Sequence, residues 1–252
     1  MEDKTMGKKI FIMSVVLLGV LALSSLTFAG TTPGSGIATT FHDLSTRGAG
    51  AAFGDTVEQA GLNRICVYCH APHNTVKPGS AAANGVGYLP LWNHQVTAVS
   101  AYTLYSNGTN DLSQNAANPM VDKAMLVSSQ PGGVSKLCLS CHDGSVAVNQ
   151  YGSSTTSHGA ATHVSARALV GGGGDLSNHH PIGFNYAAVQ TLDTGINPPT
   201  AMMGVYPIND LLPGGNVECS TCHDVHNSKA QGKKLLWVED TNSAFCLTCH
   251  VK

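Results

Sequence analysis

Cys66-Val67-Tyr68-Cys69-His70 is the stretch that decides the fold, because the same pattern returns three more times along the chain. The other copies are Cys138-Leu139-Ser140-Cys141-His142, Cys219-Ser220-Thr221-Cys222-His223 and Cys246-Leu247-Thr248-Cys249-His250. All 8 cysteines of the 252-residue chain belong to a copy. Chance placement of these residue types would give about 0.01 such motifs. The pattern therefore organises the chain from residue 66 onward.

Each motif has the spacing of a c-type haem attachment site. Two thiols three residues apart on a helical turn can add to the two vinyl groups of one porphyrin, and the following histidine can bind the iron. Zinc ribbons need paired Cys-x-x-Cys units with four ligands, and a thioredoxin-like motif would occur once within a βαβ unit. The sequence predicts four covalently attached haem c groups, with attachment residues Cys66, Cys69, Cys138, Cys141, Cys219, Cys222, Cys246 and Cys249 and iron ligands His70, His142, His223 and His250.

The second axial position of each iron decides between electron transfer and small-molecule chemistry. Eight of the 12 histidines lie outside the motifs, so supply exceeds demand and bis-histidine ligation of all four irons is the simplest interpretation. Five histidines are candidates for four positions, and the sequence does not remove the fifth: His42, His73, His94, His180 and His226. His158 and His163 lie in a Ser/Thr/Gly/Ala-rich stretch and are expected to be solvated.

Two of the candidates stand in the same relation to a motif. His73 follows His70 by three residues, and His226 follows His223 in the same way. Neither can wrap around a porphyrin to the far face of its own iron. We therefore expect each to bind the iron of a different, nearby haem; the alternative for such a histidine is a hydrogen bond to a propionate.

The other three candidates are judged from their neighbours. His180 precedes Pro181, which holds the backbone of His180 extended, so His180 is preferred over the adjacent His179 as a ligand. His42 and His94 each have a polar neighbour that could orient an imidazole through a hydrogen bond.

Composition excludes several classes of protein. Charged residues make up 11% of the chain, against about 25% in typical proteins, and the formal net charge is −2. A nucleic-acid binder with a basic surface and an acidic disordered chain are both excluded.

Residues 1–29 are interpreted as a secretory signal peptide. Lys4, Lys8 and Lys9 precede an apolar run over 10–23, and small residues at 27 and 29 suit cleavage before Gly30. The remainder, 30–252, is predicted to form a single tetrahaem domain that is exported from the cytoplasm.

The fold class predicted for 30–252 is a mostly coil multihaem c-type cytochrome. No apolar period of 3.6 or 2 persists, and Gly- and Pro-rich stretches interrupt the chain. We expect short helices at the haem motifs, a few short strands near 96–105 and 235–238, and a stack of haems as the core.

With these motifs in place, the chain resembles the extracellular tetrahaem cytochromes of the OmcE type, which polymerise into conductive filaments. The likeness spans most of the chain after the leader and rests on the four motifs together with Phe41-His42-Asp43-Leu44-Ser45, Ala71-Pro72-His73-Asn74, Pro90-Leu91-Trp92-Asn93-His94, His180-Pro181-Ile182-Gly183-Phe184 and Asp224-Val225-His226. It implies closely spaced bis-histidine haems and head-to-tail assembly in which one distal histidine comes from the neighbouring subunit. His73 is the preferred crossing residue, with His42 as the alternative.

Three functions are compared. The first is extracellular electron transfer as the repeating subunit of a cytochrome filament, with redox-partner cytochromes and an extracellular acceptor such as a metal oxide as further partners. The second is a discrete periplasmic tetrahaem shuttle. The third is a multihaem nitrite or hydroxylamine enzyme, which needs an open-sited haem and an altered motif that the sequence lacks. The favoured reading is an electron carrier and not an enzyme.

Overall fold

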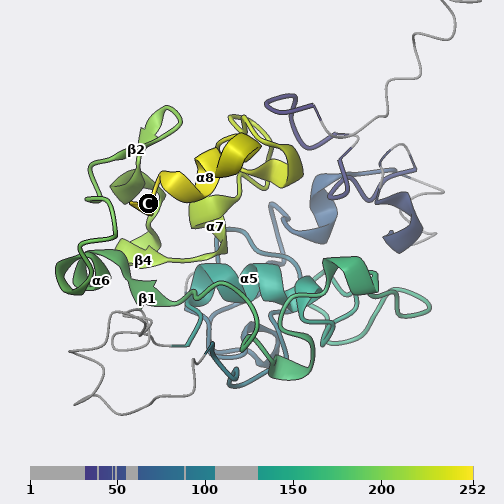
Figure 1. The fold of residues 1–252 in the computed structure, drawn as a ribbon. Helices are drawn as coiled ribbons and strands as arrows, with labels where there is room; N and C mark the ends of the chain where they lie inside the picture. The colour runs from purple at the N-terminus through teal and green to yellow at the C-terminus, as the bar shows by residue number, and fades with distance from the viewer. Residues whose placement is uncertain are drawn as a thin grey trace, which may run out of the picture.

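The chain is mostly irregular backbone, interrupted by short helices and two-residue strands (Figure 1). The computed structural model describes residues 32–38, 40–46, 48, 50–54, 62–87, 89–105 and 130–251. The signal peptide predicted at 1–29 lies outside these residues. Within the described part of the chain, no helix is long and apolar enough to cross a membrane.

Four α-helices are described: α5 (Gly133–His142), α6 (Tyr186–Leu192), α7 (Cys219–Cys222) and α8 (Ala244–Leu247). Short 3-10 turns lie before and between them, at Ala51–Phe53, Cys66–Tyr68, Ala81–Ala83, Ala166–Ala168, Gly172–Gly174, Ile208–Leu211, Pro213–Gly215, Lys233–Leu235 and Thr241–Ser243. Each of the four motifs therefore coincides with a helical element, as the Cys-x-x-Cys-His spacing predicts.

The start of α5 is fixed by a contact across the chain. Glu218 accepts hydrogen bonds from the Gly132 N–H at 3.1 and 3.2 Å and from the Ser135 hydroxyl. This satisfies donors that a helix N-terminus leaves free. Residue 132 must be small, because a Cβ there would lie 2.4 Å from a Glu218 carboxylate oxygen. Glu218 directly precedes Cys219, so this cap joins the second motif to the third.

The strands form two separate antiparallel pairs. β1 (Phe184–Asn185) pairs with β4 (Asn216–Val217), and β2 (Met202–Met203) pairs with β3 (Tyr206–Pro207). Together they are too short to make a sheet that could serve as a core.

The strands predicted near 96–105 and 235–238 are wrong. Each region contributes a single isolated bridge, Thr103 with Asp175 and Leu236 with His223. In the first region the Asn84 side-chain amide donates a hydrogen bond to the Thr97 carbonyl, which a neighbouring strand would otherwise use. In the second region Leu235 has a left-handed backbone with φ +61°, which ends an extended segment.

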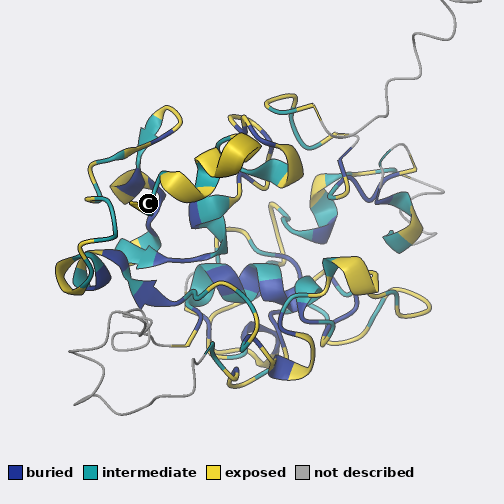
Figure 2. Cartoon of the chain, viewed as in Figure 1, coloured by how far each residue is buried: buried dark blue, intermediate teal, exposed yellow. Residues whose placement is uncertain are grey.

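Apolar packing is divided among small clusters. The largest joins β1, α6 and β4 and contains Phe184, Tyr186, Val189, Met203, Ile208, Leu211, Leu212 and Val217, with Phe245 and Cys249 packed against it. Another contains Leu44, Tyr68, Val148 and Tyr151, with Cys141 at its margin. Figure 2 shows α5 buried or half-buried along its length and α8 largely exposed. Both clusters touch motif cysteines, so the packed regions lie beside the motifs. The haem stack as a core stays a prediction.

Candidate haem sites

Each motif folds so that its two cysteines and its histidine share one helical turn. The histidine N–H donates to the carbonyl of the first cysteine at 2.8 Å for His70, 3.1 Å for His223 and 3.0 Å for His250. His142 is the last residue of α5, which contains the whole second motif. All eight cysteines are free thiols, so none is used in a disulfide.

Three motif histidines present the same ring nitrogen for metal binding. In each, Nδ1 lies within hydrogen-bond distance of a backbone carbonyl; the acceptors for His70, His142 and His223 are Pro90, Ala168 and Lys234, at 3.1, 2.7 and 3.0 Å. Nδ1 is therefore the protonated nitrogen, and Nε2 keeps the lone pair that a metal requires. This arrangement fits the role that the motif assigns to these rings.

Three motif histidines also face a second imidazole. The ring centroids lie 6.0 Å apart for His42 and His142, 6.2 Å for His70 and His226, and 6.3 Å for His180 and His250. Imidazole nitrogens bind transition metals at about 2.0–2.1 Å, so two rings on opposite sides of one metal ion have centroids about 6 Å apart. The observed spacings therefore fit an iron between each pair.

The distal ring of the first pair is held in its neutral form. Burial, with nearby His142, His223 and His226, lowers the pKa of His42 to about 4. Neutral imidazole is the form that binds metal. His42 Nδ1 is buried and has no hydrogen-bond partner among the described residues, a property it shares with the Trp92 indole nitrogen.

His94 is placed differently from the other candidates. It is 1% exposed, its Nδ1 lies 2.7 Å from the Gln95 carbonyl oxygen, and its Nε2 lies 2.9 Å from that of Ala147. Burial lowers its pKa. A neutral imidazole has one N–H, so the ring can donate to only one of these two carbonyls. Within the described residues the His94 ring faces Trp92, with centroids 6.5 Å apart. The axial role for which the sequence makes His94 a candidate stays a prediction. The ring ties residues 93–95 to the segment after α5.

His73 and His223 are the remaining candidates for one site. Both are exposed, and within the described residues neither ring faces another histidine at the spacing of the three pairs. In the single chain, the motif histidine His223 and the predicted distal histidine His73 therefore do not form a facing pair.

The histidines given no ligand role have other surroundings. His179 accepts a hydrogen bond from the Gly171 N–H at 3.4 Å, whereas the neighbouring His180 faces His250. His158 is exposed and stacks on Tyr151 with ring centroids 4.4 Å apart, and His163 is exposed.

The first and third motifs are built alike, which the sequence analysis missed. A later segment of the chain makes the same two backbone hydrogen bonds to each of these motifs. At the first motif the Ala71 N–H donates to Leu91 O (3.1 Å) and the Asn93 N–H donates to Cys69 O (2.8 Å). At the third motif the Asp224 N–H donates to Leu235 O (2.8 Å) and the Trp237 N–H donates to Cys222 O (3.2 Å). Leu91 and Leu235 both have left-handed backbones, at φ +51° and +61°. His73 and His226 therefore occupy equivalent positions in a repeated unit. The letters Leu-Trp at 91–92 and 236–237 do not reveal this equivalence, because Leu91 corresponds to Leu235 and Asn93 to Trp237.

The second and third motifs touch each other. The Cys138 and Cys219 thiols are close enough to raise the pKa of Cys138 and lower that of Cys219. The Cys219 N–H donates to the Ser135 hydroxyl at 3.0 Å. With the Glu218 cap, these contacts hold α5 against α7. The middle two attachment sites are therefore adjacent in space.

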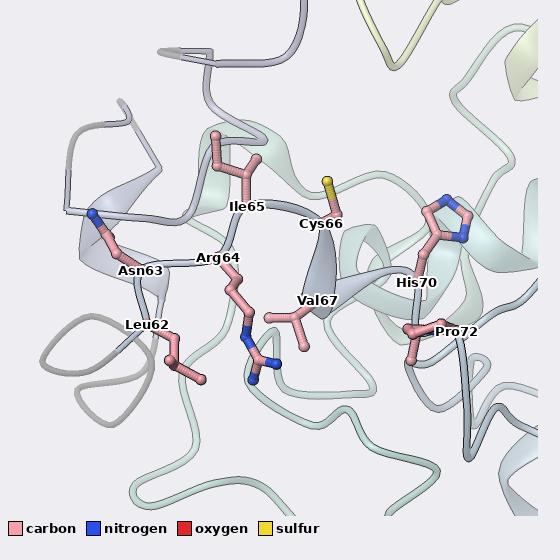
Figure 3. A pocket seen from close by; sticks show the side chains of 9 residues that line it. Leu62, Asn63, Arg64, Ile65, Cys66, Val67, His70 and Pro72 are labelled. Atoms are coloured by element: carbon pink, nitrogen blue, oxygen red, sulfur yellow. The ribbon is translucent and has the colours of Figure 1, made fainter.

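A hollow lies at the first motif and is lined by 62–67 and 70–72. Figure 3 shows the Cys66 thiol and the His70 ring projecting to the same side, while the Arg64 guanidinium leaves the chain on the other side. Attachment through the thiol and ligation by the ring are thus compatible at this motif.

Within the described residues, no three His, Cys, Asp or Glu side chains converge as a metal-ion site. Each pair of rings offers two nitrogen ligands, which would suit an iron whose other donors come from a porphyrin.

Comparison with known families gives one match. Residues 213–252, which contain the third and fourth motifs, match the model of the family described as "Doubled CXXCH motif". The match indicates a c-type cytochrome with covalently bound haem c, whose role is electron transfer. Searches of curated proteins and of solved structures found no protein that matches the chain.

Proposed function

We propose that this cytochrome carries out extracellular electron transfer through four bis-histidine haems, as the repeating subunit of a filament. Bound haem supplies a one-electron ferric/ferrous couple. The cysteine pairs fix each porphyrin to the chain, and the histidines hold each iron on both faces. An iron held on both faces has no position for a substrate, so the chain acts as an electron carrier and not as an enzyme.

The facing imidazoles carry this proposal. His142 with His42, His70 with His226, and His250 with His180 have centroid spacings of 6.0, 6.2 and 6.3 Å, as two axial ligands of one iron would have. In each pair one ring comes from a motif and the other from a distant part of the chain. Ligation therefore also holds together segments that share little apolar packing.

The fourth site supports assembly. His226, in the second repeated unit, faces the motif histidine of the first unit. His73 is the equivalent residue of the first unit, so its expected counterpart is His223, the motif histidine of the second. Both are exposed in one chain. His73 of one copy would thus complete the site at His223 of the next. A head-to-tail contact that does not close into a ring gives a filament.

The remaining parts of the proposal concern location and partners. The basic and apolar pattern of residues 1–29 supports export, with the cell surface or extracellular space as destination. Redox-partner cytochromes would deliver electrons, and an extracellular acceptor such as a metal oxide would receive them.

The test uses the full chain expressed with its leader and purified from the culture medium. We expect four haems per chain, a low-spin spectrum, no carbon monoxide binding after reduction, and filaments by electron microscopy. His73→Ala should leave soluble single chains in which one haem in four binds carbon monoxide, whereas His163→Ala, an exposed control, should change neither property.

Other outcomes would overturn it. Four low-spin haems in a protein that stays monomeric when concentrated would refute the filament and favour the periplasmic shuttle. A high-spin haem that turns over nitrite or hydroxylamine would refute the electron-carrier role.

A further inference from the structure

The residue after each motif histidine differs among the four motifs. Asp143 and Asp224 follow the second and third motif histidines, whereas Ala71 and Val251 follow the first and fourth. Both aspartates are buried, with 3% and 5% of their surfaces exposed. A carboxylate buried in a chain with few charges needs a reason, because burial of a charge is costly.

The partners of Asp143 are all neutral groups. One oxygen accepts from the Ser145 N–H at 2.7 Å, and the other accepts from the Tyr102 hydroxyl at 2.7 Å and from the Thr97 hydroxyl. All three of these neighbours can donate to the carboxylate. Neutral donors orient the charge without cancelling it.

Asp224 is arranged in the same way. One oxygen accepts from the backbone N–H of His226 at 3.2 Å; the other accepts from the N–H groups of Lys229 and Ala230 at 2.7 and 3.1 Å and from the Ser228 hydroxyl at 3.2 Å. These donors are also neutral. A buried aspartate therefore follows the histidine of each of the two middle motifs, and buried Glu218 precedes Cys219 of the third.

We propose that Asp143 and Asp224 set the reduction potentials of the second and third haems, making these two harder to reduce than the first and fourth. The proposal rests on haem ligation at His142 and His223. A ferric centre that gains one electron from an external reductant becomes more negative, so a buried carboxylate beside it opposes the gain. The propionates of haem are common to all four sites, so they do not cancel the difference in reduction potential between the middle two haems and the other two.

The size of the effect follows from proximity. Neighbouring residues are about 3.8 Å apart along the chain, so a carboxylate next to an iron-binding histidine lies within about 10 Å of the iron. A unit charge at about 10 Å, in an effective dielectric of about 20, changes a one-electron equilibrium by about tenfold. Exposed Lys229, Lys233 and Lys234 near the third motif are screened by solvent but act oppositely, so we expect the larger effect at Asp143.

The experiment is a spectroelectrochemical titration of the holoprotein with dithionite as reductant at pH 7. Asp143→Asn is the cleaner variant, because the amide can keep its oxygen towards Ser145 and place its NH2 against two hydroxyls that can accept. We expect reduction of one haem to become about tenfold more favourable, about 59 mV for one electron. Asp224→Asn should raise the reduction potential of a different haem by a smaller amount. The double variant should raise the potentials of both haems, each by the amount seen in the single variant.

Two controls separate charge from structure. Asp175→Asn removes an exposed carboxylate and should leave all four components unchanged. Thr97→Val removes a donor to Asp143 but keeps the charge, so it should not raise any potential. If Thr97→Val reproduces the upward shift of Asp143→Asn, the effect is structural and the proposal fails.

The outcomes also distinguish this inference from the proposed function. An Asp143→Asn protein with four low-spin haems and unchanged potentials would overturn the role of the aspartate alone. A wild-type protein without low-spin haem at the second motif would overturn the ligation on which the inference rests.

Discussion

Replacement of His226 by alanine tests the axial pairing most directly, because His226 and His94 are both candidates by sequence, and in the structure His226 faces a motif histidine whereas His94 faces Trp92. His226→Ala removes the ring that lies 6.2 Å from His70, while the attachment cysteines and the proximal ring of that haem remain. One iron in four should become five-coordinate. About one quarter of the haem should then bind carbon monoxide after reduction.

The matched control is His94→Gln. It removes a buried ring with both nitrogens at backbone carbonyls, at 2.7 and 2.9 Å. A neutral ring donates one of these two hydrogen bonds, and its loss should lower the free energy of unfolding by about 1 kcal/mol. The axial ligands are untouched, so no haem should bind carbon monoxide.

The assay is a carbon monoxide difference spectrum of the reduced protein, normalised to the haem content of each variant, with thermal unfolding measured in parallel. The reasoning is refuted if His94→Gln opens a haem and His226→Ala does not. It is also refuted if His226→Ala opens none of the four, since its ring would then have no iron to serve.

Three further predictions follow from single contacts. His42→Ala should open the haem at His142, so that the double variant with His226→Ala binds carbon monoxide at about half of its haems; a value that stays at one quarter would mean that both rings serve one iron. Ile208→Ala, at a fully buried position of the largest cluster, should lower the free energy of unfolding by about 3 kcal/mol, whereas exposed Val205→Ala should stay within about 0.5 kcal/mol in the same denaturant titration. Trp237→Phe removes the indole donor to the Ser220 carbonyl at 3.0 Å and should lower the melting temperature by the equivalent of about 1 kcal/mol without changing the haem content, and an unchanged melting temperature would contradict that hydrogen bond.

The motifs could be located from sequence because their structure is local. Cys219 and His223 are joined by one backbone hydrogen bond across four residues, so spacing alone determines the turn. The partner of each motif histidine could not be derived, because it depends on contacts between residues far apart in the chain, such as His42 with His142. His94 likewise lies 2.9 Å from the carbonyl oxygen of Ala147, a contact between distant segments that the sequence neighbours of His94 do not reveal.

The strand errors have a related cause. Residues 96–105 and 235–238 carry β-branched and aromatic side chains, which favour strands when a neighbouring strand is available. Here Lys234 and Leu235 adopt left-handed backbones, at φ +58° and +61°, and the Lys234 carbonyl turns towards His223 Nδ1. The backbone of this segment places a carbonyl beside a motif histidine, and strand propensity carries no information about that contact.

The equivalence of His73 and His226 has a consequence for assembly under the proposed function. The contact of His226 with the first motif lies inside one chain, and the proposed contact of His73 with the third motif lies between chains. If the two units are equivalent, both joints use the same pair of positions: a histidine three residues after a motif, and the motif histidine of the adjacent unit. A filament would then be a continuous series of such units, in which neighbouring units are linked alternately within one polypeptide and between two polypeptides. The two kinds of contact would differ only in whether the polypeptide continues from one unit to the next. The spacing between the two axial histidines would be the same between subunits as within one chain.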